Sequence, residues 1–202
     1  MNILSDLKSN FKVVEPIFER DILALGYSLD DINETLEENV FEKVDVNIQG
    51  FDFGNVYVLP QYSELFDLYA RSIDKFELIR IYFLGDNFEK GYYSGVFILN
   101  ILGLCNQMFI SQTLFSRMAV TPLRLTAYNA DIVINPLSDK YCKEDAFNIM
   151  FSEALNKYSN CFDNSWSSCL IDLIGKNLVS LDMLQMIEKE SDRIAVKNIF
   201  TQ

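Results

Sequence analysis

The stretch Gly91–Gln107 reads GYYSGVFILNILGLCNQ, and its residue order is the most informative in the chain. Ser94 is a residue type that favours a helix N-cap. The apolar residues behind it recur as they do along the buried side of a helix: Val96, Phe97, Leu99, Ile101 and Leu102. Gly103 is placed to end this helix with a positive φ angle, which glycine adopts at little steric cost. The stretch therefore predicts a buried helix that opens at Ser94 and ends at Gly103.

Upstream of this stretch, the sequence predicts three short helices and a β-hairpin. The helices cover the ranges 2–11, 17–25 and 29–40. Gly26 separates the second helix from the third, and Ser28 with Asp31 approximates a capping box. The two β-prone runs cover 41–48 and 53–59 and are joined by Gln49–Asp52. This order is typical of a winged helix-turn-helix, in which the third helix is the recognition helix and Gln49–Asp52 is the wing tip.

The remaining segments predict a second domain of mixed structure. A connecting helix is expected over 64–84, and Gly85–Asn87 forms a turn that marks the boundary between domains 1–85 and 86–202. Strands are expected over 108–115, 122–128 and 131–135, of which the last two form a hairpin. Helices are expected over 144–157, 167–174 and 178–200. The predicted fold class is α/β (α+β), with a winged-helix-like domain followed by a mixed α/β to helical domain.

Composition and charge limit the function classes. The chain has 202 residues, half of them hydrophobic, and a net charge of −12. Residues 1–85 carry 7 Lys+Arg against 16 Asp+Glu, a net of −9, and residues 86–202 carry 10 against 13, a net of −3. Such a chain is not steered towards phosphate backbones. The N-terminus lacks a signal-peptide pattern, and the longest apolar run, Val96–Cys105, is too short to cross a bilayer. We therefore expect a soluble, cytoplasmic protein with no membrane partner.

The residue inventory argues against catalysis. The chain has no histidine, which excludes Ser-His-Asp and Cys-His catalysis and any zinc site with a histidine ligand. Its four cysteines have no CxxC spacing and are expected to be buried, reduced thiols: Cys105, Cys142, Cys161 and Cys169. Three acidic pairs are the weak basis for a metal site and are better explained as solvated helix faces: Asp30–Asp31, Glu37–Glu38 and Glu144–Asp145. The sequence therefore predicts no enzyme activity, no cofactor and no metal.

Two functions remain open for the winged-helix-like domain. A DNA-reading helix places Arg, Lys, Asn or Gln against base edges. The predicted recognition helix instead offers Asp30, Asp31, Asn33, Glu34, Glu37, Glu38 and Asn39, with no basic residue. If DNA is bound, the hairpin residues Lys43, Asn47 and Gln49 are better candidates than the helix. The alternative is a winged helix that serves as a structural or protein-binding module.

Two phrases of the sequence resemble one known family. Gly54 precedes Asn55 and the phrase Val56–Pro60, VYVLP, which resembles the end of the hairpin in the N-terminal winged helix of abortive-infection antitoxins of the AbiEi type. The stretch Gly91–Gln107 resembles that family's signature Y-S-x-x-x-A-L-x-x-x-G-L-T-x-Q-x-P. The coinciding residues are Tyr93, Ser94, Leu99, Gly103, Leu104 and Gln107. The chain departs from the signature at Ile98 and Cys105, and it has Phe109 in place of the proline. The likeness covers roughly residues 10–130.

The resemblance implies an antitoxin that acts beside a nucleotidyltransferase toxin in phage defence. In that family the N-terminal winged helix represses its own operon by binding operator DNA, and the C-terminal domain is associated with neutralising the toxin. The residues themselves keep a runner-up open, a winged-helix module that has lost DNA binding and acts through protein contacts. A metal-dependent enzyme built on carboxylates is a third hypothesis.

One feature of the fold would favour DNA binding over the other functions. It is a basic stripe formed by Lys43, Lys90, Arg117 and Arg124.

Overall fold

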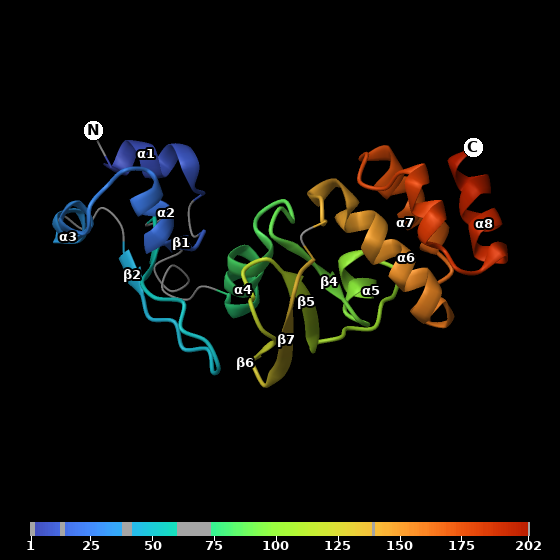
Figure 1. The fold of residues 1–202 in the computed structure, drawn as a ribbon, viewed down its shortest axis with the longest axis horizontal. Coiled ribbons are helices and arrows are strands. Elements are labelled where there is room, and N and C mark those ends of the chain that lie inside the picture. Colours follow the sequence, from blue (N-terminus) through green and yellow to red (C-terminus); the bar gives the residue numbers. More distant parts are fainter. Residues whose placement is uncertain (1–2, 13–14, 38–41, 60–73, 139, 202) are drawn as a thin grey trace. The chain divides into compact units, whose positions relative to one another are not determined.

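The computed structural model describes residues 3–12, 15–37, 42–59, 74–138 and 140–201. The chain divides into two compact units, Met1–Ile81 and Tyr82–Gln202, whereas the sequence placed the boundary after residue 85. Both units contain helices and a sheet (Figure 1), so the predicted mixed α/β class is confirmed.

The first unit is built on a small three-stranded sheet. Its elements are α1 (Ile3–Asn10), β1 (Ile17–Phe18), α2 (Glu19–Ala24), α3 (Leu29–Glu37), β2 (Glu42–Val44) and β3 (Val56–Val58). The strand order is β1-β3-β2, and both pairings are antiparallel. A helix was expected from residue 17, but Ile17 and Phe18 form β1. They pair with Tyr57 and Val56, and all four side chains are buried, so tertiary pairing overrides the local helical pattern.

The core of this unit comes from one side of each helix and from β3. Leu7 of α1, Ile22 of α2 and Ile32 of α3 are each at most 1% exposed and pack in one cluster with Ile17 and Tyr57. The regular strands β2 and β3 are shorter than predicted. The residues between them form the hairpin connection, in which Gly50 and Gly54 have positive φ angles of 98° and 68°. Residues 38–41 of the predicted elements lie outside the described residues.

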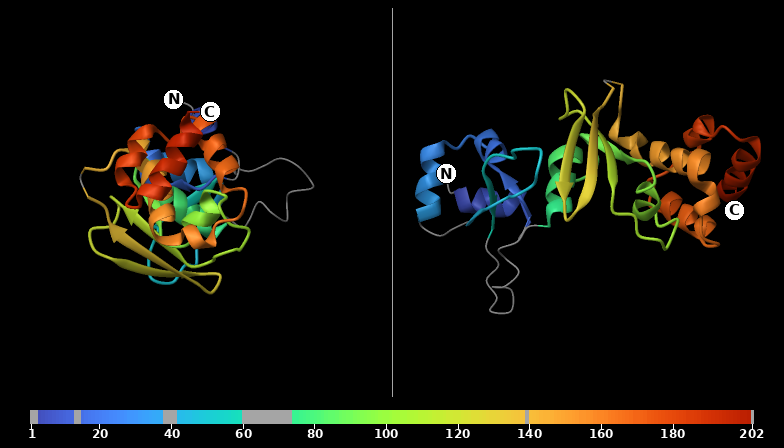
Figure 2. Two further views of the ribbon diagram at one scale, coloured as in Figure 1. Left: turned by 90° about the vertical axis from the view of Figure 1, so that its right-hand side faces the viewer. Right: turned by 90° about the horizontal axis from the view of Figure 1, so that it is seen from below.

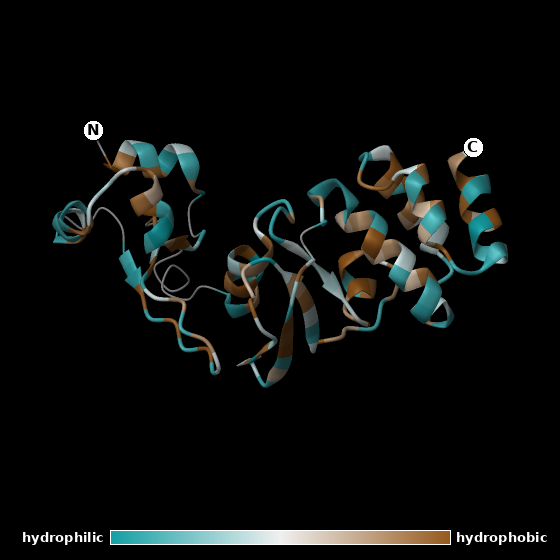
Figure 3. Ribbon diagram, in the orientation of Figure 1, coloured by the Kyte–Doolittle hydropathy of each residue, from teal (hydrophilic) through white to brown (hydrophobic). Residues whose placement is uncertain are grey.

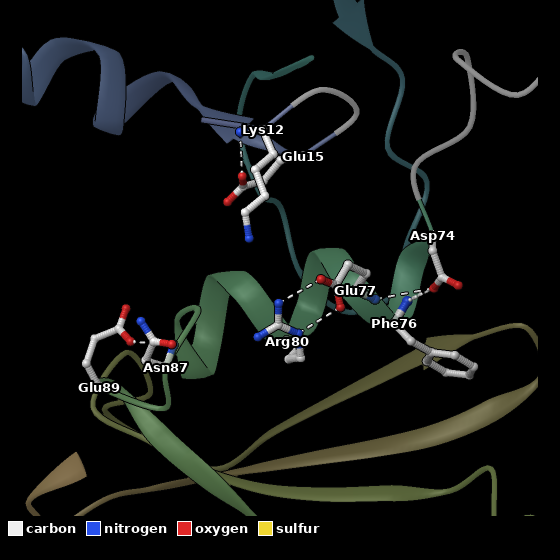
Figure 4. Close-up of polar contacts among 8 residues, drawn as sticks. All are labelled: Lys12, Glu15, Asp74, Phe76, Glu77, Arg80, Asn87 and Glu89. Atoms are coloured by element: carbon white, nitrogen blue, oxygen red, sulfur yellow. Dashed lines mark hydrogen bonds and ion pairs between the residues drawn. The ribbon is translucent and has the colours of Figure 1, made fainter. Parts of the chain in front are cut away.

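Helix α4 (Lys75–Leu84) begins at an aspartate cap. Asp74 Oδ1 accepts hydrogen bonds from the backbone N–H groups of Phe76, at 2.7 Å, and Glu77, at 3.3 Å (Figure 4). One turn on, the Arg80 guanidinium donates two bonds of 2.7 Å to the Glu77 carboxylate, which hold the pKa of Glu77 below its ordinary value of 4.5. The predicted helix over 64–84 is therefore present from Lys75 onwards, and its first part lies outside the described residues.

The second unit contains a four-stranded mixed sheet. Its strands are β4 (Gly91–Ser94), β5 (Gln112–Ser116), β6 (Leu123–Ala127) and β7 (Ala130–Pro136). Their order is β4-β5-β7-β6, and only the β5–β7 pair is parallel. The predicted hairpin is confirmed for β6 and β7. Its two turn residues, Tyr128 and Asn129, have φ angles of 50° and 62°, as a type I′ turn requires.

Helices lie on the β4 side of this sheet (Figures 1 and 2). They are α5 (Ile98–Ile101), α6 (Ala146–Tyr158), α7 (Trp166–Gly175) and α8 (Glu190–Phe200), with the 3-10 turns η1 (Lys143–Asp145), η2 (Ser159–Cys161) and η3 (Leu181–Met186). Helix α6 packs against β4, α5 and η3, and α7 packs against α8. One helix was expected over 178–200, but extended backbone at Ile187 and Lys189 separates η3 from α8. The Arg193 guanidinium donates to the Ile187 carbonyl at 2.7 Å and holds this break.

The predicted helix opening at Ser94 is wrong. Gly91–Ser94 is strand β4, because Tyr92 and Tyr93 pair with β5, and the helix α5 covers only Ile98–Ile101. The predicted end of that helix is confirmed: Gly103 has a φ angle of +68°, and the next N–H, of Leu104, donates to the Leu99 carbonyl at 2.8 Å. This is the bond of a Schellman C-cap.

Candidate functional site

The exposed surface of α3 and the β2–β3 hairpin is the candidate binding surface of the first unit. Gly26, with a φ angle of +92°, turns the chain between α2 and α3. The predicted capping box is confirmed. The Ser28 N–H donates to Asp31 Oδ2 at 2.7 Å, and the Asp31 N–H donates to Ser28 Oγ at 3.2 Å. Hydrogen bonds from the Ser28 side chain and backbone lower the pKa of Asp31 from its ordinary 3.8.

Helix α3 presents an acidic face to solvent. Ile32 and Thr35 face the core, and Thr35 Oγ1 donates to the Asp31 carbonyl at 2.6 Å. The exposed residues of this helix are Leu29, Asp30, Asp31, Asn33, Glu34 and Glu37. The helix is hydrophilic over most of its ribbon (Figure 3), and carboxylates at this density repel phosphates. Residues Glu38 and Asn39 of the predicted recognition helix lie outside the described residues.

The three predicted DNA-binding residues are all exposed on the hairpin. Lys43 lies on β2 opposite Tyr57, and Gln49 stands directly before the turn residue Gly50. Asn47 lies between them in sequence, and its carbonyl accepts a 2.6 Å bond from Lys75 Nζ. Within the described part of the chain, the side chains of Lys43, Asn47 and Gln49 have no hydrogen-bond partner. They are therefore available to a ligand.

Two buried tyrosines fix the elements that carry this surface. Tyr57 of β3 donates to Glu19 Oε2 of α2 at 3.1 Å, and Asn55 Nδ2 donates to the same oxygen at 2.5 Å. Burial, and then the bond to Glu19, raises the pKa of Tyr57 to about 12. Tyr27, just before α3, donates to Asp6 of α1 at 2.5 Å, and this bond raises its pKa to about 12. The hydroxyl groups thus tie α1, α2 and β3 together.

The basic residues that could form a stripe belong to two different units. Lys43 lies in the first unit, and Lys90, Arg117 and Arg124 lie in the second. The Arg117 guanidinium donates to the Tyr141 carbonyl and lies 5.7 Å from the centre of the Tyr141 ring. Arg117 is therefore engaged within its own unit, whereas Arg124 is exposed on β6.

The family-motif residues are structural in this fold. Tyr93, Leu99 and Leu104 are at most 3% exposed and pack in the core. Ser94 does not cap a helix. Its hydroxyl donates to both carboxylate oxygens of Glu153 on α6.

At the other end of the motif, Gln107 is exposed. Its carbonyl accepts a 2.7 Å bond from the Asn100 side-chain amide, which holds the segment that follows α5. None of these contacts forms a reactive arrangement.

The structure also gives the arrangement of the metal-ligand residue types and of the cysteines among the described residues. Within these ranges, no three His, Cys, Asp or Glu side chains lie together in a way that could hold a metal ion. All four cysteines are free, and none is buried: Cys142 is exposed and the other three are half-buried. The expectation of buried thiols is therefore wrong. Among the described residues, no helix combines the length and apolar content needed to span a bilayer.

Sequence reasoning missed Glu153 and a cavity of about 370 Å³ in the second unit. Glu153 is the one carboxylate of α6, and it stands among the buried residues Met150–Ser152 and Ala154–Leu155, a signal that could have marked it as having a partner. The cavity is lined by three separate segments, 86–88, 143–147 and 177–178, and no local pattern links them.

No protein-family model matches the chain, and neither a curated protein nor a solved structure is significantly similar to it. The likeness to the AbiEi-type antitoxins therefore stays a prediction that depends on the quoted residues alone.

Proposed function

We propose that this protein is an antitoxin and transcriptional regulator of an abortive-infection system, and that it acts by binding rather than by catalysis. The observation that carries the proposal is the order of elements in the first unit. Helix, strand, two helices and a hairpin follow one another, with sheet order β1-β3-β2 and a tight turn at Gly26 between α2 and α3. In a winged helix-turn-helix, α3 is the recognition helix and β2–β3 is the wing.

In this proposal the wing makes the principal contact with operator DNA. Lys43, Asn47 and Gln49 provide a cation and two amides on one exposed hairpin, and such groups bind phosphates and base edges. The acidic face of α3 limits the affinity. Binding is therefore expected to be weak and to fall steeply as salt rises.

One observation favours a second candidate function, a protein-interaction module without DNA binding. The exposed face of α3 carries Asp30, Glu34 and Glu37 beside Leu29, whose side chain is 53% exposed. Carboxylates around an exposed apolar residue complement a basic protein surface, and opposite potentials speed association. A basic nucleotidyltransferase toxin would be such a partner.

The two candidates are separated by a titration with the protein's own upstream DNA at roughly 50 mM and 200 mM salt. The hairpin variant Lys43→Gln is compared with the α3 variant Glu34→Gln, in which an exposed side chain of the other element is neutralised. The repressor proposal expects Lys43→Gln to weaken binding and to lower the salt slope by about 1. It expects Glu34→Gln to strengthen binding. No DNA binding at the lower salt concentration would exclude the repressor and leave the protein-interaction module.

The antitoxin proposal expects a nucleotidyltransferase gene beside the gene for this chain, and co-expression of the two proteins tests it. A complex that survives size-exclusion chromatography, together with restored growth, would support neutralisation by binding. Continued toxicity with no complex would contradict it.

A further inference from the structure

A cavity of about 370 Å³ opens on the second unit, and all of its lining residues belong to that unit. Its volume lies within the range of small-molecule sites. Three segments line it: the turn before β4, the start of α6 and the residues after α7. The lining residues are Asp86, Asn87, Phe88, Lys143, Glu144, Phe147, Asn177 and Leu178.

Two phenyl rings give the cavity an apolar wall. The rings of Phe88 and Phe147 meet edge to face with centroids 5.4 Å apart, and both side chains are half-buried. Phe88 has a φ angle of +61°, which is an outlier for a bulky residue. Its carbonyl accepts bonds from the Tyr141 hydroxyl, at 2.6 Å, and the Gly91 N–H, at 3.3 Å. These bonds hold the strained backbone and so fix the ring at the cavity, and strain of this kind clusters at functional sites.

The positive φ angles elsewhere have local explanations. Tyr128 and Asn129 form the type I′ turn, and Asn177, with a φ angle of +56°, follows α7 at the position where a helix C-cap adopts this conformation. Phe88 is thus the one such residue among the described non-glycine positions that neither a hairpin turn nor a regular helix cap accounts for.

The rim of the cavity is charged. Asp86 and Glu144 supply two carboxylates and Lys143 supplies one ammonium group, and all three residues are exposed. In the part of the chain that the structure describes, the side chains of Lys143 and Glu144 have no hydrogen-bond or ion-pair partner. The Asn87 N–H donates to Glu89 at 3.0 Å, which keeps the turn beside Asp86 closed (Figure 4).

We propose that this cavity binds a basic amino acid, either free or at the carboxyl end of a peptide. The guanidinium or ammonium group pairs with Glu144, and the aliphatic stem packs on the rings of Phe88 and Phe147. Lys143 pairs with the carboxylate of the ligand. A cation is favoured because the exposed Glu144 carboxylate has no hydrogen-bond or ion-pair partner among the described residues, on a unit whose net charge is −3.

Calorimetric titration of the full chain tests this site, with L-arginine as the probe and L-citrulline, its neutral isostere, as the comparison. L-Arginine is expected to bind, and L-citrulline at least about tenfold more weakly, since a charge-assisted bond is lost. Agmatine lacks the carboxylate, so it should bind the unsubstituted chain about tenfold more weakly than L-arginine does. The variant Lys143→Gln should bind agmatine and L-arginine with equal affinity. A tripeptide ending in arginine separates the sources: tighter binding than L-arginine indicates a peptide ligand, and weaker binding indicates the free amino acid.

The variant Glu144→Gln is compared with Asp131→Asn, which neutralises an exposed carboxylate on β7 outside the cavity. Both lie at the surface, so both are expected to fold, which circular dichroism checks. Glu144→Gln should lower the affinity for L-arginine about tenfold, and Asp131→Asn should leave it unchanged. The proposal is overturned if L-citrulline binds as tightly as L-arginine, if the two variants behave alike, or if no heat is released at millimolar L-arginine.

Discussion

The hydroxyl of Ser94 lies 2.9 and 3.0 Å from the two carboxylate oxygens of Glu153, a residue 59 positions further along the chain. The Gly95 N–H donates to the same carboxylate at 3.2 Å, and Lys157 Nζ lies 3.2 Å away on the next turn of α6. The Glu153 side chain is only 13% exposed. These bonds connect the end of β4 to α6 and satisfy a carboxylate that would otherwise be poorly solvated.

Ser94→Ala is expected to destabilise the second unit by about 1–2 kcal/mol, because a part-buried carboxylate loses a donor. Ser94→Asp should destabilise it more than alanine does, since it places a second carboxylate against Glu153. A helix cap would give the opposite order, because aspartate caps as well as serine does. Urea unfolding measures both changes, and Ser168→Ala, at an exposed position on α7, is the control. An aspartate variant as stable as the natural chain would contradict the contact.

Gly91→Ala is expected to destabilise the sheet by about 1–3 kcal/mol or more. A Cβ atom on Gly91 would collide with the carbonyl oxygen of Phe115 in the neighbouring strand β5, and neither backbone can move without breaking the β4–β5 pairing. Gly175→Ala is the matched control, since a Cβ there meets nothing within 4 Å. It is expected to be neutral or slightly stabilising. Thermal unfolding compares the two, and equal melting temperatures would refute the steric argument.

The features that the sequence predicted correctly depend on residues close together in the chain. The capping box joins Ser28 to Asp31, and Gly103 ends a helix whose last carbonyl groups lie directly before it. The predicted helix cap at Ser94 was wrong because the partner of Ser94 is 59 residues away, and the residue stands at the end of a strand. The predicted helix start at Ile17 was wrong for the same reason, because the strand partner of Ile17 is Tyr57. Local patterns carry no information about such partners.

The two candidate sites also differ in how far they can be predicted from the sequence. The exposure of Lys43 and Asn47 could be predicted, because they alternate with the apolar Val44, Val46 and Ile48. The cavity could not be predicted, because the chain brings Phe88 and Phe147 together only in the folded unit. The backbone strain at Phe88 also has no sequence signal, since phenylalanine ordinarily avoids a positive φ angle.

The first unit is expected to lose part of its stability in acid through Asp31. The pKa of Asp31 is lowered in the folded state, so its contribution is present above the ordinary value of 3.8 and is lost as the pH falls below that value through the lowered pKa. Asp31→Asn removes this pH-dependent contribution to stability. The difference in unfolding free energy between the natural chain and Asp31→Asn should therefore shrink as the pH falls from about 5 to 3.

Asp30→Asn is the control for the acid measurement, because Asp30 is an exposed neighbour on the same turn of α3. The difference in unfolding free energy between Asp30→Asn and the natural chain should change less over the same pH range. If Asp31→Asn and Asp30→Asn give the same dependence on pH, the capping box does not contribute to stability in solution.

At alkaline pH, the dependence of the unfolding free energy on pH is expected to reflect the ionisation of Tyr57. Burial and the bond to Glu19 raise its pKa from 10.0 to about 12, so the folded state favours the neutral phenol. That contribution is fully present below pH 10.0 and is lost as the pH rises through the folded value of about 12. At about pH 9, Tyr57→Phe should be less stable than the natural chain by about 0.5–1.5 kcal/mol, because it loses the bond to Glu19. Above pH 10.0 the natural chain should lose stability faster than the phenylalanine variant, and the difference in stability between them should narrow.

Urea unfolding at a series of pH values measures this difference between the natural chain and Tyr57→Phe. The control is Tyr128→Phe, at a side chain 55% exposed in the β6–β7 turn. A gap between the natural chain and Tyr57→Phe that stays constant across the alkaline range would show that the phenol of Tyr57 is not held neutral by the fold.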